Sequence, residues 1–277
     1  MGKFDGVLLA SDFDNTLLYT EDALRTGAPV PPLLERDREA LEYFMAQGGR
    51  FAIATGRART TFRRYVPMAA PNAPVILANG AQLYDFSREV LLEERTVPTT
   101  IAGDLLELME ELPELSVEAY HGEDIYIWNP NKWTWFHLER AKCTAEECPI
   151  DQMPQPWGKA ILHQETDLLW QAQEYIQARW GDRYEAIFSN FHMLELTGKG
   201  TTKGGMVLTL AQRLGIAREN IYCVGDNQND IPMLEVSAVP YAPGDCAEAV
   251  RAWGARLLPN SEEGAIAGLV EELDKRY

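Results

Sequence analysis

Two aspartates near the N-terminus, Asp12 and Asp14, have the type and spacing for metal or acid–base chemistry. Carboxylates two residues apart repel each other unless they share a proton or a cation. A hard divalent cation with oxygen ligands removes that repulsion, and magnesium is the usual partner of phosphate groups. The pair alone has a simpler explanation, as acidic loop residues that cap the next helix.

A second acidic cluster follows the apolar run 221–224 and contains Asp226, Asn229 and Asp230. On its own, this stretch could be a turn in which Asp and Asn side chains bond the nearby backbone. Together with the first pair, it brings more carboxylates toward one place, and converging acids need a counter-ion. The two clusters combined therefore predict a metal site.

Lys203 stands between Thr202 and Gly204, where Thr202 is suited to begin a helix as its N-cap. A lysine in the first helical turn opposes the helix dipole, so helix formation alone does not favour it. Beside a bound phosphate, the lysine and the free backbone N–H groups of the first turn would act together. The alternative is an ordinary solvated surface lysine.

Thr55 and Gly56 follow the apolar run 51–54 and precede a basic stretch that begins with Arg57. A hydroxyl followed by glycine at the end of a strand lets the backbone approach a ligand oxygen closely. The alternative is a simple strand-to-helix turn. Of the basic stretch, Arg57 alone is expected near the site.

These residues stand directly after short apolar runs that end abruptly in small or polar residues. Such continuous runs are typical of strands buried on both faces in a parallel sheet, and helical patterns separate several of them, as in α/β proteins. Since ligands of such sheets bind beyond the carboxyl ends of the strands, the candidate residues should gather at one edge. The runs are 7–10, 51–54, 75–78 and 221–224, and the helical patterns are 34–47, 58–65 and 204–214.

The middle of the chain differs in composition, since six of the seven tryptophans lie between Trp128 and Trp180. Strand-like segments alternate there with two amphipathic helical patterns, and the sheet motifs resume afterwards. We therefore expect a second α/β domain at 83–197, inserted into a core domain made of 1–82 and 198–277.

The formal net charge of −17 argues against nucleic acid or an anionic membrane as a partner, because both attract basic surfaces. The four cysteines lack the spacing of a zinc site. No signal peptide and no membrane-spanning apolar stretch are evident. A reducing cytoplasmic location is the default expectation.

The motifs in this order closely resemble those of the haloacid dehalogenase superfamily of phosphohydrolases, and the large insertion resembles the α/β cap of its Cof-type branch, subfamily IIB. The resemblance implies a Rossmann-like doubly wound parallel sheet with an inserted α/β cap. The sequence departs from the family pattern in two places. Asn15 stands where the family usually has glycine, and residues 239–245 replace the family's more common Val-Ala-Met-x-Asn-Ala run. Asn tolerates unusual backbone angles, so the first departure should be harmless.

The resemblance also implies a role for each candidate residue. Asp12 would be the nucleophile and Asp14 the acid and base that serves the leaving oxygen and then water. Thr55, Gly56, Lys203 and Asn229 would bind the phosphoryl group, with Thr55 and Lys203 also counted as catalytic. Mg²⁺ would be held by Asp12, Asp14 (through its backbone carbonyl) and Asp226, with Asp230 supporting the metal or Lys203.

The expected function is a magnesium-dependent phosphatase that hydrolyses a small phosphorylated metabolite, with a sugar phosphate as the first choice. Two alternatives remain open: a phosphomutase or phosphotransferase on the same framework, or a catalytically silent binding domain. Aromatic and histidine side chains of the cap are conceivable substrate contacts, although such residues more often form core: His121, Trp128, Trp133, Trp135, His137 and His192. The oligomeric state cannot be predicted from these features.

Overall fold

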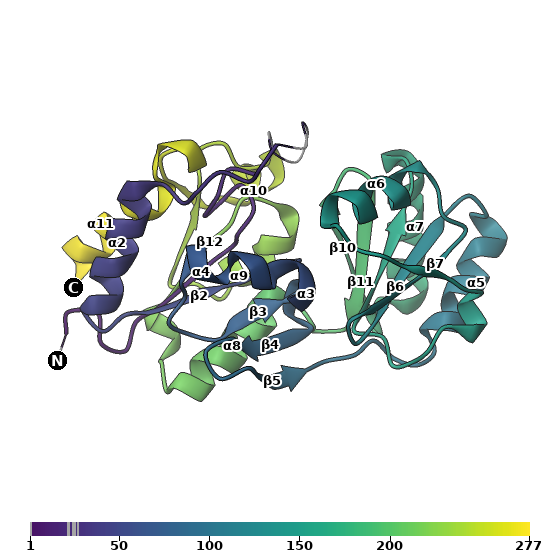
Figure 1. Ribbon diagram of the computed structural model, residues 1–277, viewed down its shortest axis with the longest axis horizontal. Helices are drawn as coiled ribbons and strands as arrows, with labels where there is room; N and C mark the ends of the chain where they lie inside the picture. The colour runs from purple at the N-terminus through teal and green to yellow at the C-terminus, as the bar shows by residue number, and fades with distance from the viewer. Residues whose placement is uncertain (1, 21–22, 24–25, 27) are drawn as a thin grey trace.

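A parallel sheet forms the centre of the part of the molecule that carries both termini (Figure 1). The computed structural model describes residues 2–20, 23, 26 and 28–277. The strand order is β14-β13-β12-β1-β2, and every neighbouring pair is parallel. The strands are β1 (Leu8–Ser11), β2 (Arg50–Ile53), β12 (Ile221–Val224), β13 (Val239–Ala242) and β14 (Arg256–Leu257).

Helices cover both faces of this sheet, so the predicted doubly wound α/β core is confirmed. On one face, α2 (Glu35–Ala46) and α11 (Ala265–Arg276) pack against Leu9 and Phe51. On the other face, α8 (Lys203–Leu214) and α9 (Ile231–Leu234) pack against the alternate strand residues, whose side chains point to that face, such as Leu8, Ala10 and Cys223. This double covering explains why the strands are apolar along their whole length.

The chain runs outward from β1 in both directions, first to β2 and later to β12 and beyond. The point where the direction changes, between β1 and β12, is where ligands of open α/β sheets bind. Shorter helical segments follow the strands of this part: α3 (Arg59–Phe62), η1 (Arg63–Tyr65), α4 (Val66–Ala69), η2 (Ala78–Gly80), η4 (Arg218–Asn220), η5 (Gln228–Asp230), α10 (Glu248–Trp253) and η6 (Ser261–Glu263).

A small antiparallel sheet of β3 (Val75–Leu77), β4 (Gln82–Asp85) and β5 (Val90–Glu94) continues beside β2. A parallel bridge between Ala54 and Ile76 joins β3 to β2. Leu83 and Leu92 pack into the same apolar cluster as α8. The division of the chain into domains at 82/83 and 197/198 stays a prediction. Residues 101–198 are called the inserted part.

The inserted part is built on a mostly antiparallel sheet with the order β10-β11-β9-β6-β7-β8. Helices α5 (Ile101–Glu111) and α7 (Thr166–Trp180) pack on one face of it. Helix α6 (Lys132–Ala141) lies on the other face, where Leu138 packs against strand residues. The other elements are β6 (Ser116–His121), β7 (Asp124–Trp128), β8 (Glu146–Glu147), η3 (Ile150–Gln152), β9 (Lys159–His163), β10 (Tyr184–Asn190) and β11 (Met193–Gly198).

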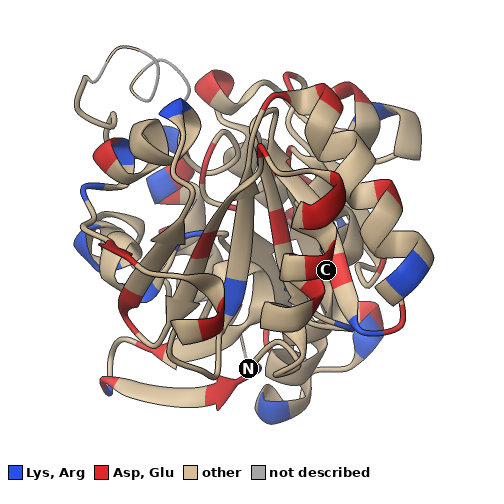
Figure 2. Ribbon diagram, turned by 90° about the vertical axis from the view of Figure 1, so that its right-hand side faces the viewer, with Lys and Arg blue, Asp and Glu red and all other residues tan. Residues whose placement is uncertain are grey.

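Acidic and basic positions are interspersed when the molecule is viewed from the inserted part (Figure 2). Over the whole chain, 42 Asp and Glu residues outnumber 25 Lys and Arg residues. Each helix in the described part of the chain is too short or too polar to span a bilayer.

Candidate active site

Lys203, fully buried at the first position of α8, connects two of the acidic motifs. Its Nζ donates hydrogen bonds to Asp12 Oδ1 and Asp230 Oδ1, both at 2.6 Å. Burial would lower the pKa of Lys203, but the two carboxylates outweigh it and raise the pKa above its ordinary value. Lys203 is therefore a permanent cation inside the site, and the surface-lysine alternative is wrong.

Close backbone packing holds Lys203 in this place. A Cβ on Gly204 would lie 1.9 Å from the carbonyl oxygen of Pro232, so only glycine lets α8 approach α9 this closely. Thr202 caps the helix, since its side chain accepts a hydrogen bond from the N–H of Gly205 at 3.0 Å. The predicted N-cap is thus confirmed.

Asp230 organises the loop after β12. Its Oδ2 accepts hydrogen bonds from the backbone N–H groups of Asp226 and Asn227, both at 3.0 Å, while its Oδ1 faces Lys203. With both oxygens engaged in this way, Asp230 is better placed to orient Lys203 and the loop than to hold a metal on its own.

Asp226 completes a group of carboxylates with Asp12 and Asp230, whose ligand atoms lie within 4.8 Å of one another. Thr16 Oγ1 donates a hydrogen bond to Asp226 Oδ1 at 3.1 Å. Burial, with Asp230 and Asp14 adding to it and Lys203 opposing it, raises the pKa of Asp12 to about 7. Burial and the neighbouring acids also raise the pKa of Asp226 well above its ordinary value.

Asp14 lies beside this group but has a different partner. Arg57 holds it through two hydrogen bonds, Nε to Oδ2 at 2.7 Å and Nη2 to Oδ1 at 2.6 Å, and Thr20 Oγ1 donates to Oδ1 at 2.8 Å. Burial alone would raise the pKa of Asp14, but Arg57 outweighs it and the pKa is lowered. Asn15 has φ 59°, the backbone angle that asparagine was expected to tolerate.

Thr55 and Gly56 form a tight turn after β2. Thr55 Oγ1 accepts a hydrogen bond from the N–H of Arg57 at 3.1 Å, and the Gly56 carbonyl accepts one from Lys159 of the inserted part at 3.1 Å. Asn229, on the opposite side, donates from Nδ2 to Asn79 Oδ1 at 3.0 Å. All eight predicted site residues thus come from loops at the carboxyl ends of β1, β2 and β12 or from the start of α8.

A small cavity lies between this site and the inserted part. The core lines it with Asn79, Lys203 and Asn229, and strands β10 and β11 line it mainly with Ile187, Glu195 and Thr197. Lys159 and Glu195 form a buried ion pair at 2.8 Å, which joins the cavity wall to the Gly56 carbonyl.

Sequence reasoning missed Lys159 and Glu195. A usable signal was present for Glu195, because it is a charged residue within the otherwise apolar segment 193–196. It also missed Arg140 on α6, which lies near enough to Asp14 and Arg57 for their charges to act on its pKa.

The conceivable contacts named from the sequence do not line this cavity in the part of the chain that the structure describes. Trp133 stacks on His192 with ring centroids 3.4 Å apart, and Trp135 points largely into solvent. His121 Nδ1 lies 2.9 Å from the carbonyl oxygen of Pro156, His137 contacts Glu118, and Trp128 packs on the core of the inserted part. The expectation that most of these side chains have structural roles fits their positions.

The charges of the site suit a divalent cation. In the described part of the chain, the four carboxylates Asp12, Asp14, Asp226 and Asp230 directly contact two cations, Lys203 and Arg57, which leaves two negative charges among these six groups when all are ionised. Carboxylate oxygens are the ligands that magnesium prefers. Burial, together with the neighbouring carboxylates, raises the pKa values of Asp12 and Asp226, and a bound cation would favour their ionised forms. The residues present therefore fit a metal ion.

A family model described as haloacid dehalogenase-like hydrolase matches residues 9–270. Pyridoxal phosphate phosphatase YbhA of Escherichia coli is 25% identical over 279 residues, covering 95% of this chain and 97% of that protein. The 5-amino-6-(5-phospho-D-ribitylamino)uracil phosphatase YcsE of Bacillus subtilis is 23% identical, covering 94% and 92%.

Among solved structures, the sugar phosphatase BT4131, of HAD subclass IIB, superimposes with a TM-score of 0.81. The match has 19% sequence identity and covers 97% of this chain and 99% of that one. At this identity the likeness shows a shared fold.

Proposed function

The chain belongs to the haloacid dehalogenase-like hydrolases and is an enzyme of the phosphatase type, and we propose that it hydrolyses a small phosphorylated metabolite. The proposed reaction depends on magnesium and passes through an aspartyl-phosphate on Asp12. The observation that carries this proposal is the position of Lys203, 2.6 Å from both Asp12 and Asp230. Lys203 joins Asp12 and Asp230, which are far apart in the sequence, and the buried Asp12 carboxylate lies directly beside the buried Lys203 ammonium group.

Asp12 is the nucleophile of this proposal. A carboxylate oxygen attacks phosphorus, the bond to the ester oxygen breaks, and the resulting acyl phosphate is readily hydrolysed. Lys203 neutralises the phosphoryl oxygens as charge spreads over them, and Thr55, Gly56 and Asn229 are placed to orient the group. Asp12, the Asp14 carbonyl and Asp226 would hold the Mg²⁺, which when bound would neutralise the phosphate and the surrounding acids.

Asp14 is the proposed acid and base. It gives a proton to the departing ester oxygen and then takes one from the water that attacks the acyl phosphate. Its lowered pKa favours the ionised form, which suits the second step. For the first step Asp14 must carry a proton, so its pairing with Arg57 has to loosen when substrate is bound.

The substrate is proposed to be a phosphate ester with a polar leaving group. The cavity next to Lys203 is small, and its outer wall carries Glu195 and Thr197, with Lys159 behind Glu195. Such a wall offers both hydrogen-bond donors and acceptors. Relatives are named as phosphatases of pyridoxal phosphate, a ribitylamino-uracil phosphate and sugar phosphates, which guides the choice of test compounds.

The test is hydrolysis of a panel containing pyridoxal 5′-phosphate, hexose phosphates and p-nitrophenyl phosphate, with Mg²⁺ and after chelation. We expect turnover only with the metal. Asp12→Asn should abolish both turnover and acid-stable labelling of the protein by phosphate. Asp14→Asn should still form labelled protein with p-nitrophenyl phosphate, because that leaving group needs no proton.

Asp85→Asn, a substitution on β4, is the matched control and should retain full activity. Robust hydrolysis by Asp12→Asn would overturn the nucleophile assignment. Transfer of the label to a second hydroxyl of the sugar instead of water would identify a mutase or phosphotransferase, and metal binding without turnover of any ester would identify a silent binding domain.

A further inference from the structure

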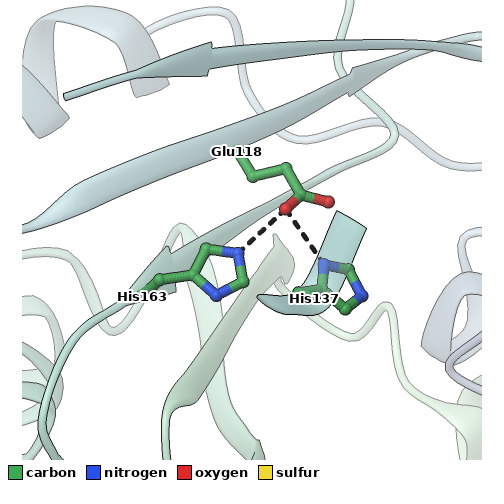
Figure 3. Close-up of side chains that lie close together, drawn as sticks. All are labelled: Glu118, His137 and His163. Atoms are coloured by element: carbon green, nitrogen blue, oxygen red, sulfur yellow. Dashed lines mark hydrogen bonds and ion pairs between the residues drawn. The ribbon is translucent and has the colours of Figure 1, made fainter. Parts of the chain in front are cut away.

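A cluster of two histidines and a glutamate lies within the inserted part, and the proposed reaction does not use it (Figure 3). His137 Nδ1 and His163 Nε2 lie 3.0 and 2.9 Å from the same oxygen of Glu118. The three ligand atoms lie within 4.8 Å of one another. Three elements supply them: β6, β9 and α6.

The fold fixes these three side chains from independent directions. In the β6–β9 register, Ser116 pairs with His163 and Glu118 with Ile161, so Glu118 and His163 are diagonal neighbours on one face. Asn131 caps α6 and also donates from Nδ2 to the His163 carbonyl at 2.8 Å. This bond ties the beginning of α6 to β9 and keeps His137 over the pair.

Glu118 has no Lys or Arg partner in the described part of the chain, and the basic groups beside it are two histidines. Its side chain is fully buried, and its hydrogen-bond and ion-pair partners in the described part of the chain are Tyr120, His137 and His163 alone. A buried carboxylate is costly unless a cation or several donors compensate it. A bound cation would supply the missing charge.

His163 provides a second observation. Its side chain is fully buried, and its other ring nitrogen, Nδ1, has no hydrogen-bond partner among the described residues. A hydrogen bond at one ring nitrogen normally fixes which nitrogen carries the proton. In the metal-free cluster the hydrogen bond to Glu118 keeps the proton on Nε2, so a metal bound at Nε2 would displace that proton to Nδ1, which is not otherwise engaged.

We propose that Glu118, His137 and His163 form a second metal site, which takes a transition-metal dication such as Zn²⁺. Two imidazoles and one carboxylate with an open fourth position are an established zinc ligand set. Tyr120 donates to the other oxygen of Glu118, as the outer-shell partners of metal ligands do. His137 is 22% exposed, which provides an entry path and a water ligand.

The ligand spacing agrees with this assignment after a small adjustment. Zinc–nitrogen and zinc–oxygen bonds of about 2.0–2.2 Å in a tetrahedron separate neighbouring ligand atoms by about 3.3–3.5 Å. The present spacings of 2.9 and 3.0 Å would therefore widen by a few tenths of an ångström. The two sites should select different metals, because imidazole binds zinc well whereas magnesium requires oxygen ligands.

The test uses the full chain carrying Asp226→Asn, which weakens the acidic site and leaves the second site to be measured. After chelation and dialysis, the protein is titrated with Zn²⁺ and with Co²⁺. We expect one equivalent of either metal to bind, with the visible absorption of four-coordinate Co²⁺. X-ray absorption of the zinc form should show imidazole ligands.

His137→Gln in the same background should weaken binding by at least tenfold, and Tyr120→Phe should weaken it by about 10–100-fold. His121→Gln is the matched control, since His121 lies on the same strand as Glu118 but outside the cluster. His137 is partly exposed, so its variant should fold, which far-UV circular dichroism checks. Absence of binding, an all-oxygen ligand shell or equal binding by the His137 and His121 variants would overturn the proposal.

Discussion

Arg57 has the largest influence on the protonation of Asp14, and at the scale of single residues this pairing was not predicted, although Arg57 was expected near the site. Burial favours a protonated Asp14, and the charge and two hydrogen bonds of Arg57 contribute most to reversing this preference, with smaller contributions from Thr20 and Lys203. Arg57 is itself held over the rings of Tyr65 and Phe13, at 4.8 and 5.4 Å from their centroids. The guanidinium is therefore positioned by aromatic faces as well as by its anion.

Arg57→Met should raise the pKa of Asp14, because burial is then opposed only by the weaker effects of Thr20 and Lys203 among the described residues. An opposite charge at this distance lowers a carboxyl pKa by about 1–3 units, so the limb of the pH–rate profile that reports Asp14 should move upward by a similar amount. The measurement is kcat/KM for p-nitrophenyl phosphate between about pH 4 and 9.

Arg63→Met is the control for that profile, since Arg63 pairs with Glu89 rather than with Asp14. Its profile should coincide with that of the unmodified chain. An unchanged profile in the Arg57 variant would show that Arg57 does not control the proton on Asp14.

The site residues near the strand ends could be predicted because each follows an apolar run. Asp12 and Asp226 are examples, since strand ends of a parallel sheet meet at one edge. The pairing of Asp14 with Arg57, and the contacts that Lys159 and Glu195 make near the site, could not be predicted. They depend on how the inserted part and the turn after β2 pack, and no local pattern encodes that packing.

At the scale of elements, the strands and helices with a regular apolar pattern were predictable within one or two residues. The run 221–224 became β12 without change, and the pattern 204–214 became α8 beginning at Lys203. Helix α6 was not predicted, because its sequence mixes aromatic and charged residues without an apolar stripe. Its stability comes from the Asn131 capping box and from packing of Leu138 on the sheet.

The contact between α2 and α11 contains a buried acid that should make stability depend on pH. Asp37 Oδ1 accepts a hydrogen bond from the N–H of Ala267 at 2.7 Å, and its Oδ2 has no partner among the described residues. Burial raises the pKa of Asp37 to about 6, although Ala267 and Arg36 oppose the rise. The folded state therefore binds this proton more tightly than the unfolded state does.

The stability from Asp37 is present below the unfolded pKa of about 4 and is lost as pH rises through about 6. Asp37→Asn cannot ionise, so relative to the unmodified chain it should gain up to about 3 kcal/mol of unfolding free energy between pH 4 and 8. Urea unfolding at several pH values measures this difference. The exposed control Asp167→Asn should show almost none, and a gain for Asp37→Asn that does not vary with pH would contradict the assignment.

At the scale of the whole molecule, the inserted part rests on the core through a few polar contacts around the site. Lys159 reaches the Gly56 carbonyl, and Asn227 Nδ2 donates to the Ser189 carbonyl at 3.3 Å. On the rim, Arg59 Nε donates to Glu123 Oε1 at 2.7 Å. Such contacts can break and reform as substrate enters and product leaves.

The rim pair offers a test of this arrangement. Arg59→Glu or Glu123→Arg alone should lower kcat/KM by at most about fivefold, because partly exposed ion pairs are worth about 0.2–1 kcal/mol. The double variant reverses both charges and should recover most of the loss. A double variant no better than the worse single variant would show that this pair does not hold the two parts together.

The place of β1 in the middle of its sheet also has a consequence for how the chain folds during synthesis. β1 pairs with β2 on one side, but its other partner, β12, is made only after the whole inserted part. The inserted part is one continuous stretch and can fold as soon as it leaves the ribosome. β2 is complete at Ile53, and at ~5–20 residues per second the chain from there to Ile221 takes about 8–34 s to make. During that interval β1 leaves an apolar strand edge unpaired on the nascent chain, which is the point at which a chaperone would be most useful.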